Sequence, residues 1–363
     1  MPEPRYVDPA QEAAIEAMVA RDSRIGVDTE FVRERTYFAE LCLVQFTAGE
    51  QIVCADALGL VDDDVRTQFW EPLMRPEWVL HSARQDIEVV YQSAGVMPRR
   101  VLDTQIAAAL VGYPPQMGYA SLVAELFDVE LPKSHTRADW SKRPLKPTLL
   151  EYAAEDVQYL LPAWDRLAER LEAAGRLDWA IEDSAALLDE RLYVVEPSAA
   201  IERVKGAGRL TGQARAALAA LAAWREKEAL SRNRPRQWIL RDPVLVDLAL
   251  RRPSSQRELG QVDGLPDKTR QRHGSRILEL LAGAGSDDGY RPPAPPDEAQ
   301  KRALKQMQRR VARVADELGI AAELLAPKKE LSAAMLGARD SRVFNGWRRD
   351  VIGAELEGLL ESG

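Results

Sequence analysis

The spacing of apolar residues changes along the chain and divides it into two kinds of structure. In the first part, short runs rich in Val, Ile, Leu, Phe and Cys are separated by polar stretches, which predicts strands at 24–31, 39–46, 51–55 and 78–81. Helical spacing predicts helices near 10–20, 63–74 and 84–94, and a strand-to-helix passage runs through 101–112. This alternation predicts an α/β domain with a mixed sheet flanked by helices.

Later segments have helical spacing throughout. From 112 to about 190 the pattern is helical apart from a loop at 128–147, and beyond 200 no convincing strand occurs. Predicted helices follow at 211–231, 242–251, 255–260, 266–283, 298–317 and 346–360. The segment 286–297 contains four prolines and no apolar periodicity, so it is predicted to be a linker.

Composition changes this picture mainly through charge. The 363 residues carry a net charge of −8, but residues 1–200 hold 19 Lys and Arg against 35 Asp and Glu, a net −16. Residues 201–286 hold 17 against 9, a net +8. A basic block of this kind is typical of a nucleic-acid contact surface, and an ordinary solvated helical surface is the alternative.

The remaining composition indicates a soluble, cytoplasmic protein. Cys42 and Cys54 lie in apolar segments and are predicted to be reduced core thiols, a disulfide between them being the alternative. The N-terminal residues are charged and lack the apolar region of a secretory signal. No apolar stretch reaches the roughly 20 residues that a membrane span needs.

The first candidate for chemistry is Asp28-Thr29-Glu30, which lies within the apolar run from Ile25 to Phe31. Side chains alternate along a strand, so Asp28 and Glu30 point to the same side. Two carboxylates on one face of a core strand repel each other and lose hydration. A hard divalent cation removes that cost, so the pair is interpreted as half of a metal site.

Further carboxylates follow at helical positions. Asp86 lies in the first turns of a predicted helix, where a surface aspartate at the helix N-terminus is the alternative. Thr148-x-x-Glu151 is predicted to form a capping box that opens a helix. On this helix Tyr152 and Asp156 are four residues apart and share a face at the margin of its apolar side, although a surface pair is also possible.

Together these residues form the series Asp-x-Glu, Asp and Tyr-x-x-x-Asp, which resembles the signature of the DEDD exonucleases with tyrosine in the last motif. The surrounding residues resemble bacterial ribonuclease D over about residues 20–170. The resemblance rests on the stretch from Asp28 to Tyr37, Leu80-His81, Leu102-Asp103-Thr104, Gly112-Tyr113, the run from Asp139 to Leu145, and Tyr152 to Val157.

The resemblance implies a ribonuclease-H-like exonuclease fold and two divalent cations, Mg²⁺ or Mn²⁺, in one site. Asp28, Glu30 and Asp156 would hold the metal on the nucleophile side. Asp28 would bridge both ions, and Asp86 would reach the second mainly through water. Tyr152 would orient the attacking water, because a phenol with an ordinary pKa near 10 is a poor base at neutral pH. Carboxylates suffice for such ions, and none of the three histidines, His81, His135 and His273, is predicted to be a ligand.

Residues around the signature are candidates for substrate contacts. Thr29, Phe31 and His81 are predicted to lie against the substrate, and His81 to pack or hydrogen-bond near the site. Trp140 and Arg143 precede the catalytic helix and have two open interpretations: a base-stacking and phosphate-binding pair, or a buried anchor with a salt bridge. Asp103 is predicted to be the N-cap of the next helix.

The segment 207–286 resembles the HRDC domain shared by RecQ-type helicases and ribonuclease D. Arg232, Arg234, Arg236 and Arg241 surround Trp238, a composition typical of a phosphate-contacting surface with one stacking platform. Arg232, Arg234 and Arg236 are predicted to contact phosphates and Trp238 to lie in the core, a stacking role for Trp238 being the alternative. Residues 298–363 resemble a second, degenerate domain of this kind. The predicted organisation is therefore an exonuclease domain at 1–175, a helical connector at 176–206, an HRDC domain at 207–286, a proline-rich linker at 287–297 and the degenerate domain at 298–363.

The resemblance implies a 3′→5′ exoribonuclease that trims extra 3′ nucleotides from tRNA precursors and releases 5′-mononucleotides. A DNA-directed 3′→5′ exonuclease is the main alternative, because the five signature residues do not distinguish ribose from deoxyribose. A non-catalytic RNA-binding adaptor is the other alternative. RNA is the implied partner, and neither a membrane nor an obligate protein partner is indicated.

Overall fold

The computed structural model describes residues 4–8, 12–20, 22–132, 138–286, 289–292, 294 and 296–361. The chain forms two compact units, and each contains segments that are distant in sequence. Unit 1 consists of Met1–Val32, Leu41–Tyr193 and Pro296–Gly363. Unit 2 consists of Arg33–Glu40 and Val194–Pro295. His135 and residues 287, 288, 293 and 295 of the predicted linker lie outside the described residues.

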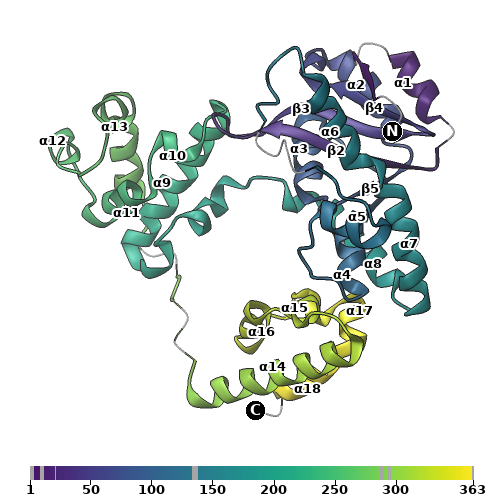
Figure 1. The fold of residues 1–363 in the computed structure, drawn as a ribbon. Helices are drawn as coiled ribbons and strands as arrows, with labels where there is room; N and C mark the ends of the chain where they lie inside the picture. Colours follow the sequence, from purple (N-terminus) through teal and green to yellow (C-terminus); the bar gives the residue numbers. More distant parts are fainter. Residues whose placement is uncertain are drawn as a thin grey trace. The chain divides into compact units, whose positions relative to one another are not determined.

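Unit 1 is built on a six-stranded mixed sheet with the strand order β1-β4-β3-β2-β5-β6. Figure 1 labels β2, β3, β4 and β5 of this sheet. Its strands are β1 (Arg5–Val7), β2 (Arg24–Val32), β3 (Glu40–Ala48), β4 (Gln51–Asp56), β5 (Glu77–Leu80) and β6 (Val101–Asp103). β4 is antiparallel to β3, whereas the pairs β1–β4, β2–β5 and β5–β6 are parallel. β2 therefore occupies an inner position of the sheet, which suits its apolar sequence.

Helices cover the sheet and extend unit 1. They are α1 (Glu12–Val19), α2 (Asp63–Leu73), α3 (Arg84–Ala94), α4 (Thr104–Leu110), α5 (Tyr119–Phe127), α6 (Pro147–Gln158), α7 (Leu160–Ala173) and α8 (Leu177–Ala185). The predicted strands and helices of this part agree with these elements to within a few residues. β1 was not predicted, because three residues next to an Asp-Pro pair carry almost no pattern.

The predicted capping box at the start of α6 is wrong. The helix begins one residue earlier, with Pro147 in its first turn and Lys146 as the N-cap, and no side chain caps it. The N–H groups of the first helical turn have no partner within the helix, so a proline, which has no N–H, leaves no donor unsatisfied there. Pro147 can therefore start the helix without a capping serine or threonine.

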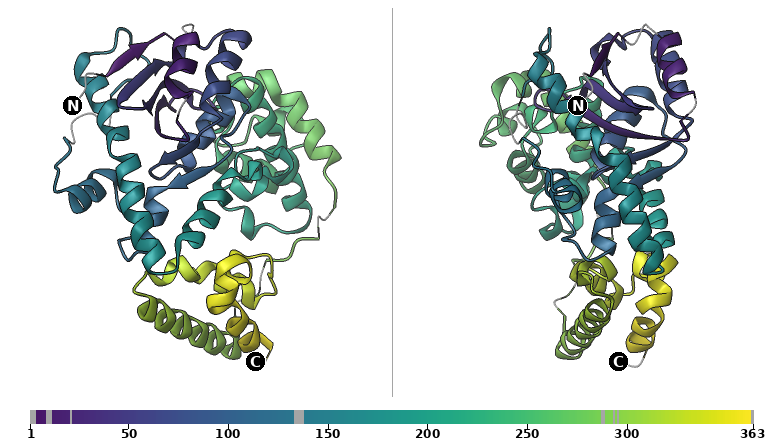
Figure 2. Two further views of the ribbon diagram at one scale, coloured as in Figure 1. Left: turned by 90° about the vertical axis from the view of Figure 1, so that its right-hand side faces the viewer. Right: turned by 45° about the vertical axis from the view of Figure 1, so that its right-hand side comes forward.

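The C-terminal segment completes the core of unit 1. It forms α14 (Glu298–Leu318), α15 (Ala322–Leu325), α16 (Lys328–Met335), α17 (Gly346–Arg348), a π-helical turn at Arg349–Gly353 and α18 (Ala354–Glu361). Figure 2 shows these helices, coloured olive to yellow, at the end of the unit that lies away from the purple N-terminal strands. The segment was predicted to be a separate domain, yet it shares one hydrophobic cluster with α4, α7 and α8.

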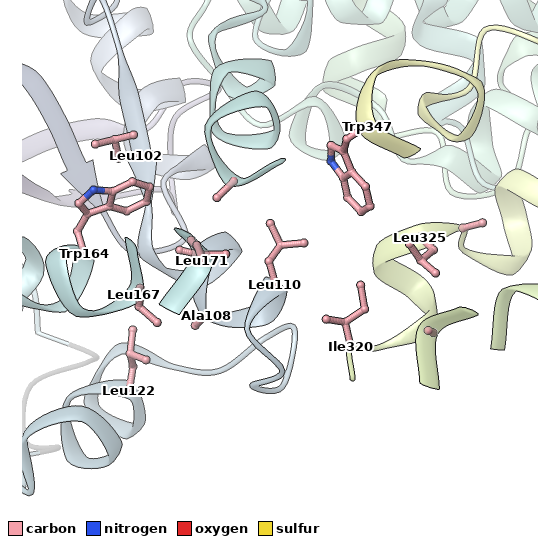
Figure 3. Close-up of a cluster of buried hydrophobic side chains, with 14 of the residues drawn as sticks. Leu102, Ala108, Leu110, Leu122, Trp164, Leu167, Leu171, Ile320, Leu325 and Trp347 are labelled. Atoms are coloured by element: carbon pink, nitrogen blue, oxygen red, sulfur yellow. The ribbon is translucent and has the colours of Figure 1, made fainter. Parts of the chain in front are cut away.

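This shared cluster joins residues more than 200 positions apart. Leu110 of α4 lies between Leu171 on one side and Ile320 and Trp347 on the other (Figure 3). The rings of Trp179 and Trp347 are stacked, with centroids 4.3 Å apart and an interplanar angle of 6°. Burial of large apolar side chains on this scale stabilises a fold by several kcal/mol, so the C-terminal helices are part of the folded core of unit 1.

A buried ion pair fixes the same contact. The Arg348 guanidinium donates to both carboxylate oxygens of Asp183, over 2.6 and 2.7 Å, and the Trp347 indole N–H donates to Asp183 at 3.1 Å. The side chain of Arg348 is only 3% exposed. Paired, bidentate geometry is what makes a buried charge tolerable, so the three side chains act together as one bracket.

Unit 2 is helical. Its helices are α9 (Gly212–Ser231), α10 (Arg236–Ile239), α11 (Asp242–Arg251), α12 (Gln256–Leu259) and α13 (Asp267–Gly283), preceded by 3₁₀ turns at Pro197–Arg203 and Ala207–Arg209. Leu218, Leu221, Leu245, Leu248 and Ile277 are among its core residues. Arg225 is fully buried and donates to the Leu240 carbonyl oxygen and to Asp242 over 2.8 and 2.6 Å, which anchors the chain after α10.

The segment Arg33–Glu40 belongs to unit 2 although it connects two strands of unit 1. The backbone N–H groups of Tyr37 and Phe38 donate to the side-chain oxygen of Asn233, over 2.9 and 3.1 Å. The Tyr37 hydroxyl donates to Glu226, which is fully buried. These contacts make the segment an integral part of the helical fold.

Within the part of the chain that the structure describes, no helix combines the length and the apolar composition needed to cross a bilayer. Cys42 and Cys54 are both buried and form no disulfide, as predicted, and burial raises the pKa of the Cys54 thiol to about 12.

Candidate active site

Two elements bring three carboxylates together. Asp28 and Glu30 come from β2 and Asp156 comes from α6, and one carboxylate oxygen from each lies within 4.8 Å of the others. Gly26 on β2 permits this approach, because a Cβ atom there would lie 3.1 Å from Leu160 Cβ and 3.2 Å from the Val157 carbonyl oxygen. The missing side chain thus lets the end of α6 sit directly on the strand.

Asp86 joins the cluster from the first turn of α3. It is 7% exposed, and Thr29 Oγ1 donates to it over 2.6 Å. Thr29 lies between Asp28 and Glu30 on β2, so the hydrogen bond holds Asp86 against the strand that carries the other carboxylates. The structure therefore brings the four predicted acidic residues into one region, and it gives Thr29 a partner inside the protein.

Gln45 is a further polar residue of the site, and the sequence predictions missed it. It is fully buried on β3, and its Nε2 donates to the Asp28 carboxylate over 2.6 Å. Its Oε1 is buried and has no hydrogen-bond partner within the described part of the chain. A single glutamine in the otherwise apolar run from Leu41 to Phe46 is the signal that could have identified it.

Burial and mutual repulsion make these carboxyl groups weak acids. Burial, followed by repulsion from Asp86, Asp156 and Glu30, raises the pKa of Asp28 well above its usual range. Burial and then the charges of Asp156 and Asp86 raise the pKa of Glu30 to about 9. Burial is also the main reason that the pKa of Asp156 rises to about 7 and that of Asp86 to about 6. The protein alone therefore does not supply enough positive charge for four ionised carboxylates.

Divalent cations would supply this charge, and the residues present fit them. The donors are carboxylate oxygens only, the ligand type that Mg²⁺ and Mn²⁺ prefer. Gln45 Oε1 is a buried acceptor without a partner among the described residues, on the same side chain whose Nε2 holds Asp28, so the site has a polar group that the described part of the chain does not satisfy. The acidic cluster therefore has the composition, burial and charge of a divalent metal site.

Tyr152 lies beside this cluster, one turn before Asp156 on α6. Its hydroxyl donates to the Asp156 carboxylate. Burial, followed by the charges of Asp156 and Glu30, raises the pKa of Tyr152 above its usual value. The phenol therefore stays protonated at neutral pH, and its oxygen lone pairs remain able to accept a hydrogen bond.

Trp140 and Arg143 anchor the loop before α6. Trp140 is only 4% exposed, and its ring packs against the Tyr152 ring with centroids 6.2 Å apart. Arg143 Nε donates to Asp56 over 2.7 Å, and its terminal nitrogens donate to Asp56 and to the carbonyl oxygens of Cys42, Trp140 and Lys142. All five N–H groups of the guanidinium are thus engaged, which supports the anchoring interpretation over the phosphate-binding one.

Two neighbouring residues also serve the fold. The Asp103 carboxylate caps α4 by accepting from the N–H groups of Gln105 and Ile106, and it also accepts from Ser82 and Ala83. The predicted N-cap role of Asp103 is therefore confirmed. His81 Nε2 donates to the Met117 carbonyl oxygen over 2.8 Å and its Nδ1 lies 2.9 Å from Thr104 Oγ1. Both ring nitrogens of His81 are engaged with the protein.

The predicted phosphate contacts of unit 2 lie around α10. Arg232 and Arg234 are exposed, Arg236 is half-buried, and Arg232 is paired with Glu228 at 2.7 Å. Trp238 differs from its prediction, because it is 59% exposed. Its helix has only one turn and no buried residue, and the buried side chain at this point is that of Leu240, directly after the helix. Phe31, the other predicted substrate contact, is half-buried on β2.

Two known protein families match the chain, one over the part that contains the sheet and one over the helical unit 2. A 3′-5′ exonuclease family matches residues 6–172, and the HRDC domain family matches residues 214–281. The ribonuclease D of Xanthomonas oryzae pv. oryzae is 36% identical over 366 residues, covering 99% of both chains. That of Acidiphilium cryptum is 35% identical and covers 97% of this chain and 93% of its own.

A solved structure extends the similarity to the whole fold. The crystal structure of Escherichia coli RNase D, described as an exoribonuclease involved in structured RNA processing, superposes with a TM-score of 0.86 at 31% identity, covering 99% of both chains. The catalytic core of RRP6 from Trypanosoma brucei, at 21% identity and a TM-score of 0.59, shares the fold over 77% of this chain. With this identity over its full length, the chain belongs to the ribonuclease D family.

Proposed function

We propose that this protein trims extra 3′ nucleotides from tRNA precursors by two-metal-ion hydrolysis and releases 5′-mononucleotides. As a member of the ribonuclease D family it is a 3′→5′ exoribonuclease that acts in RNA processing. The observation that carries the proposal is the half-buried group of Asp28, Glu30 and Asp156 oxygens within 4.8 Å of one another, with Asp86 held beside it by Thr29.

Asp28, Glu30, Asp86 and Asp156 are the proposed metal ligands. Asp28 is proposed to serve both ions, because it lies beside Glu30 and Asp156 and its carboxylate is also repelled by Asp86. Gln45 holds one Asp28 oxygen, which fixes the direction of the other. When bound, a pair of divalent cations lowers the pKa of a water nucleophile and neutralises charge on the phosphate and on the leaving 3′-oxygen.

Tyr152 is proposed to orient the attacking water. Its proton is committed to Asp156, so its oxygen can only accept, which aligns a water O–H along a fixed direction. Its raised pKa makes it unsuitable as a general base at neutral pH. Trp140, packed against the ring, limits the positions that the phenol can take.

RNA is the substrate class of the family, and tRNA precursors are the specific substrate that we propose. Support comes from the net charge of +8 on residues 201–286, which offsets the acidic catalytic part, and from the similar E. coli protein, whose description includes structured RNA. Maturation of tRNA would also place the protein in the cytoplasm. The same site on a DNA-specific enzyme remains the alternative that the assay must separate.

The test uses the purified full chain with Mg²⁺, Mn²⁺ or EDTA on three substrates: 3′-extended tRNA, an unstructured RNA oligomer and a DNA oligomer. We expect mononucleotides from the RNA substrates with either metal, none with EDTA, and slower hydrolysis of DNA. Asp28→Asn should abolish hydrolysis and leave RNA binding in place, because it removes metal-binding charge and leaves the basic unit intact. Near wild-type turnover by this variant, or a preference for DNA, would disprove the proposal.

A further inference from the structure

Trp238 is an exposed tryptophan that separates two hollows on unit 2. It lies on the single turn α10, with 59% of its surface exposed. Both hollows are lined in part by Trp238 and Ile239, and their volumes are about 480 and 1090 Å³. An indole left in water contributes little to the core and adds apolar surface, so its position suggests a role in binding.

The first hollow is basic. Its lining includes Arg232 from the end of α9 and Lys268 and Arg272 from α13, together with Thr269 and Gln271. Lys268 and Arg272 are one helical turn apart and exposed, and among the described residues no carboxylate lies within ion-pair distance of either. Two unpaired cations beside an indole form the combination that binds a phosphate chain with a base stacked next to it.

The second hollow is largely apolar. Leu240, Pro243, Val244 and Pro266 contribute to its wall, and Gln237 and Arg241 contribute polar groups at the side of α10. Only one acidic residue, Asp263, is part of the lining. An apolar hollow with a few hydrogen-bond donors suits a nucleobase better than a phosphate.

The turn that carries Trp238 is held rigidly. Trp238 N–H donates to the Pro235 carbonyl oxygen over 2.8 Å, and buried Arg225 donates to Leu240 just after the turn. On the other side, Asn233 accepts from the backbone of Tyr37 and Phe38. A platform that is already fixed loses little conformational entropy when a ligand binds.

We propose that Trp238 is a stacking platform for unpaired bases of RNA, with Lys268 and Arg272 binding the phosphates next to the stacked base. This proposal rests on the proposed function, since it assumes that the chain acts on RNA. Unpaired nucleotides fit better than duplex RNA, because bases in a duplex have no free face to stack on an indole. The unpaired cations favour a polyanion over a protein partner.

The test measures the affinity of the full-length protein for an unstructured, fluorescently labelled RNA oligomer, in EDTA to prevent hydrolysis and at several salt concentrations. Trp238→Ala should weaken binding by roughly five- to 150-fold with an unchanged salt dependence, and Trp238→Phe should recover much of the loss. The double variant Lys268→Gln, Arg272→Gln should lower the slope of log affinity against log salt by about 1.4.

Matched controls lie on the same unit but outside both hollows. Leu250→Ala removes another apolar side chain that is 58% exposed, and Arg257→Gln removes another exposed cation. Both should change affinity by less than twofold. Circular dichroism melting curves should be alike for all variants, because none of the substituted side chains is buried.

The outcomes separate the two proposals. If Trp238→Ala binds RNA as tightly as Leu250→Ala does, the platform does not exist, whatever the activity of the wild type. If the wild type hydrolyses no RNA with Mg²⁺ or Mn²⁺, the proposed function fails, and this result is independent of the binding comparison. An equal loss of RNA affinity in the control variants and in Trp238→Ala would also disprove the stacking platform, because the loss would then not be specific to Trp238.

Discussion

Neutralising one carboxylate of the acidic cluster should stabilise the metal-free protein while destroying its metal site. Glu30→Gln keeps the size of the side chain and removes one buried negative charge. Glu30 has a pKa of about 9 because it is buried and faces Asp156 and Asp86. The unfolded chain holds the same group near its ordinary pKa of about 4.5, so folding at neutral pH requires Glu30 either to take up a proton or to keep a buried charge.

The size of this effect follows from the difference in pKa. A raised carboxyl pKa costs nothing below the unfolded value of about 4.5, and the cost grows by about 1.4 kcal/mol per pH unit until the folded value is reached. At pH 7.5 this gives at most about 4 kcal/mol. Since neighbouring carboxylates share the repulsion, we expect Glu30→Gln to gain about 2–4 kcal/mol, or roughly 5–15 °C in melting temperature.

The assay is thermal unfolding of wild type and Glu30→Gln at pH 5, 7.5 and 9, with EDTA or with Mg²⁺. In EDTA the difference should be small at pH 5 and large at pH 7.5. In Mg²⁺ the wild type should gain stability, by about 2.7 kcal/mol at a hundredfold excess over Kd, and the variant should gain less. Glu50→Gln, which removes an exposed carboxylate of unit 1, is the matched control and should show neither effect.

An opposite result would be a Glu30→Gln variant that is no more stable than wild type in EDTA at pH 7.5 and that responds to Mg²⁺ as the wild type does. Glu30 would then be neither destabilised by its neighbours nor a metal ligand.

Three further results are expected. Binding of Mg²⁺ at pH 7 should release about one proton or more, because Glu30, whose pKa is about 9, is protonated there in the metal-free site. Calorimetry in buffers of different ionisation enthalpy measures this release, and no release would contradict the raised pKa of Glu30. Tyr152→Phe should lower kcat by about 10²–10⁴-fold and keep the Mg²⁺ affinity, whereas a large loss of metal binding would make Tyr152 structural. Asp183→Ala should destabilise unit 1 by about 3–5 kcal/mol in denaturant unfolding, because it leaves buried Arg348 unpaired, and a loss below 1 kcal/mol would show that the bracket contributes little.

The acidic cluster could be predicted because its signals are local. Alternation along β2 puts Asp28 and Glu30 on one side, and helical spacing puts Tyr152 next to Asp156. The N-cap role of Asp103 also depends on a few neighbouring residues. The close packing of α6 on β2 could not be predicted from the pattern of either segment, because it depends on the absence of a side chain at Gly26.

The errors concern contacts between distant segments. Trp238 was expected in the core because tryptophan is usually buried, but its short helix has no buried residue, and Leu240, directly after the helix, is buried instead. The C-terminal helices were expected to stand apart, and nothing near Trp347 indicates that its ring stacks on Trp179. Long-range packing of this kind depends on the three-dimensional arrangement, which residue spacing does not encode.

The excursion Arg33–Glu40 restricts how such an enzyme can be rearranged. The chain passes between the two units four times. The first passage comes directly after β2, the strand that carries Asp28 and Glu30. Replacing residues 194–295 with the corresponding segment of another protein would remove Asn233 and Glu226. Tyr37 would then lose the hydrogen-bond partners of its backbone N–H and its hydroxyl. A transplanted helical domain would therefore need a matching nuclease loop, so the two parts are expected to be inherited as a pair.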